Sequence, residues 1–256
     1  MERPRLIGMS TKEVQNRLRS RAAALIACTA TLLSATQGAK AATEDSGAWF
    51  GVFANGQLPP SLNDSTGSWR LWLDAQLRLG DDASRFSQGV VRPGVGYALS
   101  EAWSLWAGYA YIRTEPPYAT TPTNEQRIWE QAIWNGAIGP TKLSSRTRLE
   151  QRFFSGGADT GWRLREFVKL VQPLGAENAW SLVVSDEIFV NLNNANFGPN
   201  LMAVAGLDRN RFFVGPGINL NQFVRLEFGY MNQYTFRHNG PDKNDQILAA
   251  NVFVNF

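Results

Sequence analysis

The sequence predicts an all-β fold, an antiparallel transmembrane β-barrel of about ten strands, with twelve strands as the alternative. Apolar and polar side chains alternate with a period of two residues in about ten segments of 10 to 14 residues. The connections between these segments alternate in length. Strands of soluble sandwiches average about five or six residues, whereas a tilted strand needs about 9–11 to cross a membrane. The length of the segments therefore favours a barrel that faces lipid.

The first 41 residues have the anatomy of a secretory signal peptide. Arginines precede an apolar run from Ala22 to Leu33, and Ala39-Lys40-Ala41 fits an A-x-A cleavage site. This segment holds 7 of the 25 Lys and Arg residues and 2 of the 22 Asp and Glu residues, so the mature chain keeps 18 and 20. The basic excess of the full chain thus belongs to the export signal, and nucleic acid is not an expected partner. Removal of Cys28 leaves the mature chain without disulfides.

Residues 42–68 are expected to form a periplasmic lead-in or a partial strand, because a strand at Trp49–Phe53 would break the even count typical of this class. The outer-membrane barrel is predicted to span residues 69–256. Compact connections follow the second, fourth, sixth and eighth strands and longer polar ones the third, seventh and ninth, as in barrels with periplasmic turns and outer loops. Phe256 ends the last strand and is the expected contact with the barrel assembly machinery. In order, the ten strands are predicted at 69–79, 87–99, 103–113, 126–135, 143–154, 162–172, 180–192, 209–219, 223–236 and 246–256.

One register of these strands is rich in charge. An arginine on the lipid face at mid-membrane costs about 2–4 kcal/mol, so this register is expected to line a positively charged lumen. Glu166 and Asp186 fall instead on the apolar register, and Glu130 is out of phase with Arg127; a β-bulge is expected to restore the register at each. The predicted lumen residues are Arg70, Asp74, Arg78, Arg92, Arg146, Arg148, Glu150, Arg152, Arg163, Arg165, Lys169, Glu187, Asn191, Arg209, Arg211, Arg225 and Glu227.

No catalytic residue, metal site or cofactor is predicted. His238, the one histidine, lies in a predicted outer loop beside Asn239, Asp242 and Asp245, which leaves a hydrolase at the rim as an alternative. No serine lies near it in the sequence, as a Ser-His hydrolase would need. One histidine without cysteine provides no zinc site. We therefore predict that the protein is not an enzyme.

The arginine-rich lumen has two interpretations. Rings of arginine and lysine can line a passage for small anions. Alternatively, the side chains fill the interior of a structural or surface-interaction barrel without transport, because a barrel of about eight strands is just wide enough to be filled. A soluble periplasmic β-sandwich also stays open, since alternation alone does not distinguish lipid from a protein core. We expect a monomer in the outer membrane, with lipid around it.

Short motifs in a fixed order carry a family resemblance. They are Arg146-Thr147-Arg148-Leu149-Glu150-Gln151-Arg152, Trp162-Arg163-Leu164-Arg165, Asp186-Glu187 with Asn191, Asp208-Arg209-Asn210-Arg211, and Gly229-Tyr230-Met231-Asn232-Gln233 with the terminal strand. Over residues 65–256 the sequence resembles an uncharacterised family of Gram-negative outer-membrane barrels, a domain of unknown function. The resemblance implies a β-barrel in the outer membrane and leaves its activity undefined.

Overall fold

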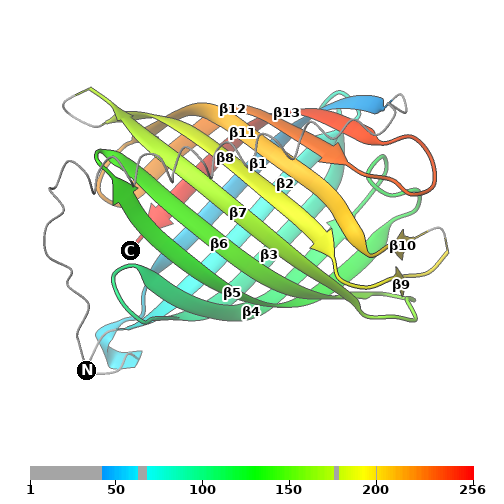
Figure 1. Ribbon diagram of the computed structural model, residues 1–256, viewed down its shortest axis with the longest axis horizontal. Helices are drawn as coiled ribbons and strands as arrows, with labels where there is room; N and C mark the ends of the chain where they lie inside the picture. Colours follow the sequence, from blue (N-terminus) through cyan, green and yellow to red (C-terminus); the bar gives the residue numbers. More distant parts are fainter. Residues whose placement is uncertain (1–41, 63–67, 176–178, 200) are drawn as a thin grey trace, which may run out of the picture. The chain divides into compact units, whose positions relative to one another are not determined.

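The computed structural model describes residues 42–62, 68–175, 179–199 and 201–256 of the 256-residue chain. Within these ranges, eleven strands close into a barrel in the order β1-β13-β12-β11-β8-β7-β6-β5-β4-β3-β2 (Figure 1). The all-β prediction is confirmed. The predicted signal peptide, residues 1–41, lies outside the described residues, and no helix long and apolar enough to cross a membrane occurs within them.

The barrel strands are 12 to 16 residues long and tilted against the long axis (Figure 1). Each of the ten predicted strands is present, with ends that differ by a few residues. The elements are β1 (Thr43–Gln57), the 3-10 helix η2 (Pro60–Leu62), β2 (Trp69–Gly80), β3 (Arg85–Ala98), β4 (Trp103–Thr114), β5 (Thr123–Ile138), β6 (Thr141–Phe154), β7 (Gly161–Leu174), β8 (Trp180–Asn191), β9 (Ala195–Asn196), β10 (Met202–Ala203), β11 (Gly206–Asn219), β12 (Val224–Thr235) and β13 (Lys243–Asn255).

The strand β1 corrects the predicted strand count, which is neither ten nor twelve. Residues expected to form a lead-in or partial strand pair along their length with two neighbours. β1 runs antiparallel to β2 and parallel to β13, from Thr43 opposite Lys243 to Asn55 opposite Asn255. This one parallel pair closes a wall whose other neighbouring pairs are antiparallel. An odd count is compatible with closure because the parallel ladder satisfies both edges.

Side chains alternate between a polar interior and an apolar exterior. On β2, Leu73 and Leu77 are 44% and 45% exposed on the outer face, whereas Asp74 and Arg78 are 1% and 7% exposed inside. This polarity is the reverse of that of a soluble barrel with an apolar core. The outer wall of the closed barrel therefore presents apolar side chains to its surroundings.

The bulges expected at three carboxylates are absent from the described strand pairs. Pairing of β5 with β6, β6 with β7 and β7 with β8 is continuous, so no extra residue shifts the register there. The register shifts lie elsewhere, at Arg78/Leu79 and Leu207/Arg209. Glu130, Glu166 and Asp186 consequently stay on the outer face. The prediction of a bulge at each of them is therefore wrong, and the fold places these three carboxylates on the outer face.

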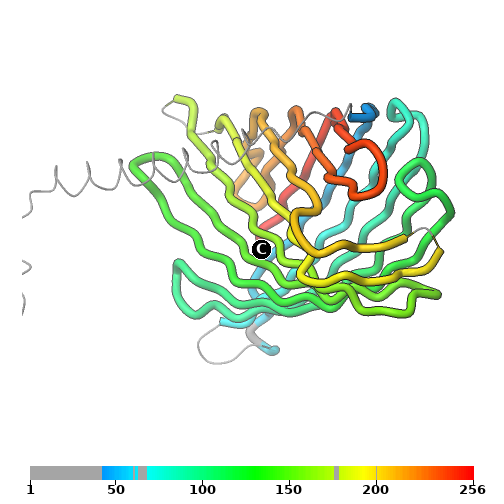
Figure 2. Tube along the Cα trace, turned by 45° about the vertical axis from the view of Figure 1, so that its right-hand side comes forward, coloured from blue at the N-terminus to red at the C-terminus, as the bar shows by residue number. Residues whose placement is uncertain are grey.

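The connections at the two ends of the barrel differ in size. Compact turns join β3 to β4, β5 to β6 and β11 to β12 at the end where β13 finishes, here called the C-terminal end. The opposite end, the loop end, carries the residues between β4 and β5 and the small β9-β10 sheet (Figures 1 and 2). There Tyr118 reaches the barrel interior and accepts a 2.9 Å hydrogen bond from Trp49 Nε1. Burial raises the pKa of the Tyr118 hydroxyl.

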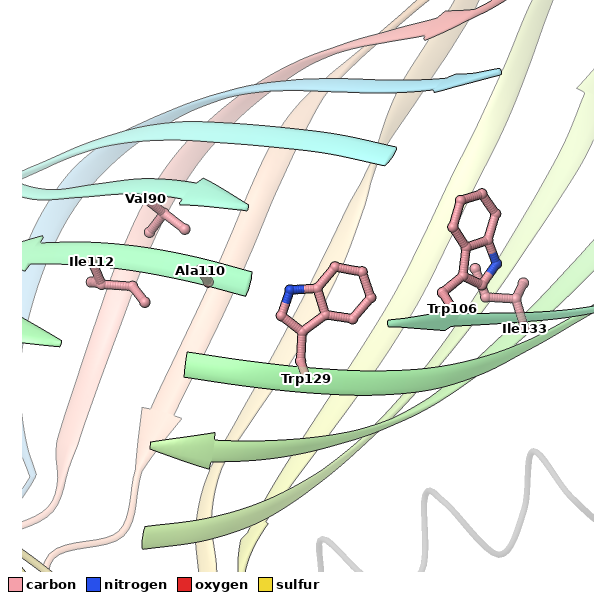
Figure 3. Packing of buried hydrophobic residues seen from close by; sticks show 6 residues of the cluster. All are labelled: Val90, Trp106, Ala110, Ile112, Trp129 and Ile133. Atoms are coloured by element: carbon pink, nitrogen blue, oxygen red, sulfur yellow. The ribbon is translucent and has the colours of Figure 1, made fainter. Parts of the chain in front are cut away.

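An apolar cluster covers one inner wall of the barrel. The Trp106 and Trp129 rings project inward from β4 and β5 (Figure 3), and Trp72 of β2 packs against them with ring centroids 5.5 and 6.4 Å apart. Glycines make room for the Trp129 ring, since a Cβ added at Gly94 or Gly108 would overlap it. The cluster consists of Val90, Trp106, Ala110, Ile112, Trp129 and Ile133.

Replacement of Gly108 by alanine is expected to lower the free energy of unfolding by about 1–3 kcal/mol, the usual cost of overpacking. The added methyl group would meet both the Trp129 ring and the Pro93 carbonyl oxygen. Gly89→Ala is the matched control, because the nearest atom to its Cβ is 3.5 Å away. Denaturant unfolding followed by tryptophan fluorescence measures both changes. An equal loss in the two variants would contradict this account.

Candidate functional site

A network of ion pairs spans the barrel interior with Glu150 of β6 at its centre. This carboxylate is fully buried and pairs with Arg163 Nη2 at 2.6 Å, Arg165 Nη1 at 2.7 Å and Arg127 Nη1 at 3.4 Å. The strand register explains the convergence, because Glu150 lies directly opposite Arg163 and one inward position away from Arg165. Three guanidinium groups therefore share one carboxylate.

The network continues toward β8 and β11 through Glu187. Arg165 Nη2 lies 2.6 Å from Glu187 Oε1, Arg146 Nη2 lies 2.8 Å from it, and Arg211 Nη1 lies 3.7 Å from Oε2. Arg165 thus bridges Glu150 and Glu187. Hydrogen-bonded pairs of this kind compensate for the cost of removing charge from water, and removal of one partner leaves the other uncompensated.

Further pairs extend the network to both ends of the interior. Glu125 binds Arg127 and Arg152 at 2.7 and 2.6 Å near the loop end. Toward the C-terminal end, Glu227 receives Lys169 and Arg225, each at 2.7 Å. Charges from most of the barrel wall are therefore linked across the lumen. The remaining inward pairs are Arg92 with Asp74, Arg209 and Arg163 with Asp208, and Lys243 with Asp45 and Asp245.

Among the described residues, two buried arginines of the inner register have no carboxylate within ion-pair distance. Arg148 is fully buried, hydrogen-bonds Gln131 Oε1 through Nε at 2.8 Å, and stacks on the Trp129 ring at 4.7 Å. Arg78 hydrogen-bonds Gln88 Oε1 at 2.6 Å and stacks on Trp49 at 4.0 Å. Aromatic faces and amides attract these cations without cancelling their charge. The interior consequently keeps an excess of positive charge.

The lumen contains two chambers. The C-terminal chamber has a volume of about 320 Å³, and the loop-end chamber about 190 Å³. Residues that line both chambers separate them and are here called the constriction. In it the Trp49 ring contacts two guanidinium groups, with its centroid 4.0 Å from Arg78 Cζ and 4.9 Å from Arg211 Cζ. The constriction consists of Trp49, Arg78, Arg92, Arg165 and Arg211.

The two chambers differ in charge. Ten cationic side chains but only two carboxylates, Glu125 and Asp245, line the loop-end chamber. Six cations and three carboxylates line the C-terminal chamber. Cations therefore outnumber carboxylates in the lining of both chambers, and the excess is larger toward the loop end. The ten cations are Arg78, Arg92, Arg127, Arg152, Arg163, Arg165, Arg209, Arg211, Arg237 and Lys243.

The structure places the residues predicted for the lumen on the inner register, at different depths. Some are partly accessible from the chambers or the barrel ends, namely Arg70, Arg146, Arg152, Lys169, Arg209, Arg211 and Arg225. Others are buried, namely Asp74, Arg78, Arg92, Arg148, Glu150, Arg163, Arg165, Glu187, Asn191 and Glu227. Asn191 binds the connection between β10 and β11, because its Nδ2 donates a hydrogen bond to the Val204 carbonyl at 3.2 Å.

Sequence reasoning missed several members of this site. Glu125 precedes the strand predicted at 126–135, and the phase conflict between Arg127 and Glu130 left Arg127 unassigned. Trp49 and Lys243 lay in segments not predicted to be strands. The alternation of Glu125, Arg127, Trp129 and Gln131 was the available signal, since all four prove to be buried on one register.

The polar residues around His238 do not form a joint site. His238 is exposed in the connection between β12 and β13. Asp242 accepts hydrogen bonds from the Tyr234 hydroxyl at 2.9 Å and the Arg237 backbone at 2.8 Å. Asp245 points into the barrel, where Gln233 and Lys243 bind it.

Comparisons with known proteins agree with an uncharacterised family. The family model described as protein of unknown function (DUF2490) matches residues 46–245, from β1 to the start of β13. An uncharacterized protein of Methylorubrum extorquens is 34% identical over 198 residues, which cover 77% of this chain and 85% of that protein. No solved structure matches the chain. The chain therefore belongs to the DUF2490 family of proteins of unknown function.

Proposed function

We propose that the protein is an outer-membrane β-barrel whose basic lumen takes up small anions and lets them pass. The apolar exterior supports the membrane location. Trp69, Trp103 and Trp180 begin three strands at the C-terminal end and are 42%, 49% and 47% exposed on the outer face, where an interfacial aromatic belt would lie. Charged side chains concentrate inside, where water rather than lipid can reach them.

The observation that carries the functional part is the charge of the loop-end chamber. Ten cations against two carboxylates attract anions and repel cations at this entrance. In the proposed orientation the loop end faces the outside of the cell, so anions enter there. The chamber volumes, about 190 and 320 Å³, suit small inorganic or organic anions rather than large solutes.

A second candidate is a structural or surface-interaction barrel without transport. The constriction favours it, because Trp49 and four arginines occupy the lumen between the chambers. The two candidates differ in one measurable property. Passage requires ionic current through the purified barrel, and a purely structural barrel carries none.

Planar bilayers that contain the purified barrel are expected to carry a small current with a reversal potential that indicates anion preference in a potassium chloride gradient. Arg209→Glu combined with Arg237→Glu should reduce this preference, because both side chains line the loop-end chamber. Arg113→Gln is the control. Arg113 lies on the outward register of β4 and pairs with Glu115 at 2.7 Å.

A barrel that inserts but carries no current at high protein concentration would reject passage and support the structural candidate. Current without anion preference would reject the role of the loop-end chamber. Insertion itself is checked on gels, since a closed barrel keeps its compact shape in cold detergent and changes mobility on boiling.

A further inference from the structure

Three carboxylates lie on the outer face near the middle of neighbouring strands. Glu130 is the eighth of 16 residues in β5, Glu166 the sixth of 14 in β7, and Asp186 the seventh of 12 in β8. β5 to β8 lie side by side in the wall (Figure 1). The three groups therefore occupy one side of the barrel at about half its height. In the proposed outer-membrane location this is the depth of the acyl chains.

Neighbouring polar side chains hold these carboxylates in place. Ser145 and Thr147 of β6 donate hydrogen bonds of 2.6 and 2.5 Å to Glu166. Asn210 Nδ2 of β11 lies 2.9 and 3.0 Å from the two oxygens of Asp186. Outward polar side chains thus gather on the neighbouring strands β5, β6, β7, β8 and β11, and this set is here called the acidic band. It consists of Glu130, Ser145, Thr147, Glu166, Asp186 and Asn210.

No lysine or arginine among the described residues forms an ion pair with a carboxylate of the acidic band. The described cations that form ion pairs bind inward carboxylates, apart from Arg113, which pairs with Glu115 at the loop end. Hydroxyl and amide groups that donate hydrogen bonds orient a carboxylate, but they are neutral and do not cancel its negative charge. Three charges without counter-ions in hydrocarbon would be costly.

The opposite side of the barrel has a different surface. The outer faces of β1, β2, β3, β4, β12 and β13 form a mostly apolar groove of about 740 Å³, which Arg113 lines at the loop end. Its outward side chains include Phe50, Val52, Leu77, Val91 and Phe228, each at least 44% exposed. Acyl chains fit this surface. The polar groups of the acidic band require a different neighbour.

We propose that the acidic band is the docking surface for another membrane protein that presents lysine or arginine side chains at this depth. Charge complementarity selects this partner, because cations would neutralise the three carboxylates and the Ser, Thr and Asn side chains could accept further hydrogen bonds. A second copy of the chain fits poorly, since a two-fold contact would oppose two acidic bands. The inference rests on the proposed membrane location but not on anion passage.

Photo-crosslinking in intact cells tests the proposal. A benzophenone amino acid replaces Thr147 in the acidic band or, as the matched control, Ala75, which is the seventh of 12 residues of β2 and lies in the apolar groove. We expect a discrete protein adduct from position 147 and lipid adducts alone from position 75. Glu166→Lys should reduce the protein adduct at least fivefold, and Glu166→Gln should reduce it less. Heat-modifiable gel mobility verifies that each variant is folded.

Each other outcome overturns the inference. Lipid adducts at both positions would mean that acyl chains cover the acidic band. An adduct of twice the chain mass would identify a second copy. A protein adduct that Glu166→Lys, Glu130→Lys and Asp186→Lys leave unchanged would exclude recognition by charge. Absence of lipid adducts at position 75, with the protein outside the membrane fraction, would reject the proposed location as well.

Discussion

Replacement of Glu150 by glutamine is expected to lower the free energy of unfolding by about 3–5 kcal/mol, the range for breaking a buried ion pair. The carboxylate is fully buried and compensates Arg127, Arg163 and Arg165. Glutamine has nearly the same shape but offers one acceptor oxygen and an amide that donates toward guanidinium donors. The three cations would then repel one another in a poorly hydrated space.

Urea unfolding of the barrel in lipid vesicles, followed by tryptophan fluorescence, measures this change. Glu130→Gln is the matched control, because it removes the same charge from an outward side chain that forms no ion pair among the described residues. In vesicles without the proposed partner this variant should lose less than about 0.5 kcal/mol or gain stability, because its charge has no counter-ion there. Similar losses for the two variants would contradict a central role for Glu150.

A second substitution distinguishes charge compensation from packing. In Glu150→Gln the arginine with the closest contact is Arg163, whose Nη2 lies 2.6 Å from the original carboxylate. Adding Arg163→Gln removes one uncompensated cation and should recover part of the lost stability. Residues of one network are not additive, so the double variant should be more stable than the sum of the single losses predicts. A purely additive result would indicate that packing dominates.

The strands of the barrel wall were predictable from local sequence, because apolar and polar side chains alternate along each strand and need no information from distant residues. Leu73 and Asp74 lie on the two faces that their order indicates. β1 was harder to assign because its parallel partner β13 is about 200 residues away, and no local pattern reveals such a pair. The assumption of an even count then removed a strand whose strand character, from Trp49 to Phe53, is visible in the sequence.

Register also accounts for what was predictable in the candidate site. Glu150 and Arg163 are cross-strand neighbours, so assignment of both to the lumen brings them together. Lys169 and Glu227 come from strands that are not adjacent, and their contact depends on the width and tilt of the closed barrel. The constriction depends on this closure too, since Trp49 and Arg211 belong to strands separated by β13 and β12.

We expect closure of the lumen to depend on Trp49 more than on any one charge. Its ring contacts the guanidinium groups of Arg78 and Arg211, and its Nε1 donates to Tyr118 of the loop between β4 and β5. The indole therefore connects the barrel wall, the ionic network and a loop that lies over the loop-end chamber. If anions pass as proposed, arginines at the constriction can change rotamer, whereas the planar ring fills a fixed volume.

Replacement of Trp49 by alanine is accordingly expected to raise the single-channel conductance several-fold. Anion preference should persist, because Arg78, Arg92, Arg165 and Arg211 still line the widened constriction. Trp49→Phe keeps an aromatic ring and loses the hydrogen bond to Tyr118, so it should have a smaller effect. Conductance and reversal potential in planar bilayers measure both properties in one experiment.

Trp106→Ala is the control for the loss of a large inward side chain. Trp106 is 4% exposed and lines the C-terminal chamber outside the constriction, so its removal should enlarge that chamber without widening the constriction. Conductance should then change little. A rise equal to that of Trp49→Ala would place the barrier in the C-terminal chamber. Unchanged conductance in Trp49→Ala would mean that the four arginines and their carboxylates close the lumen without the ring.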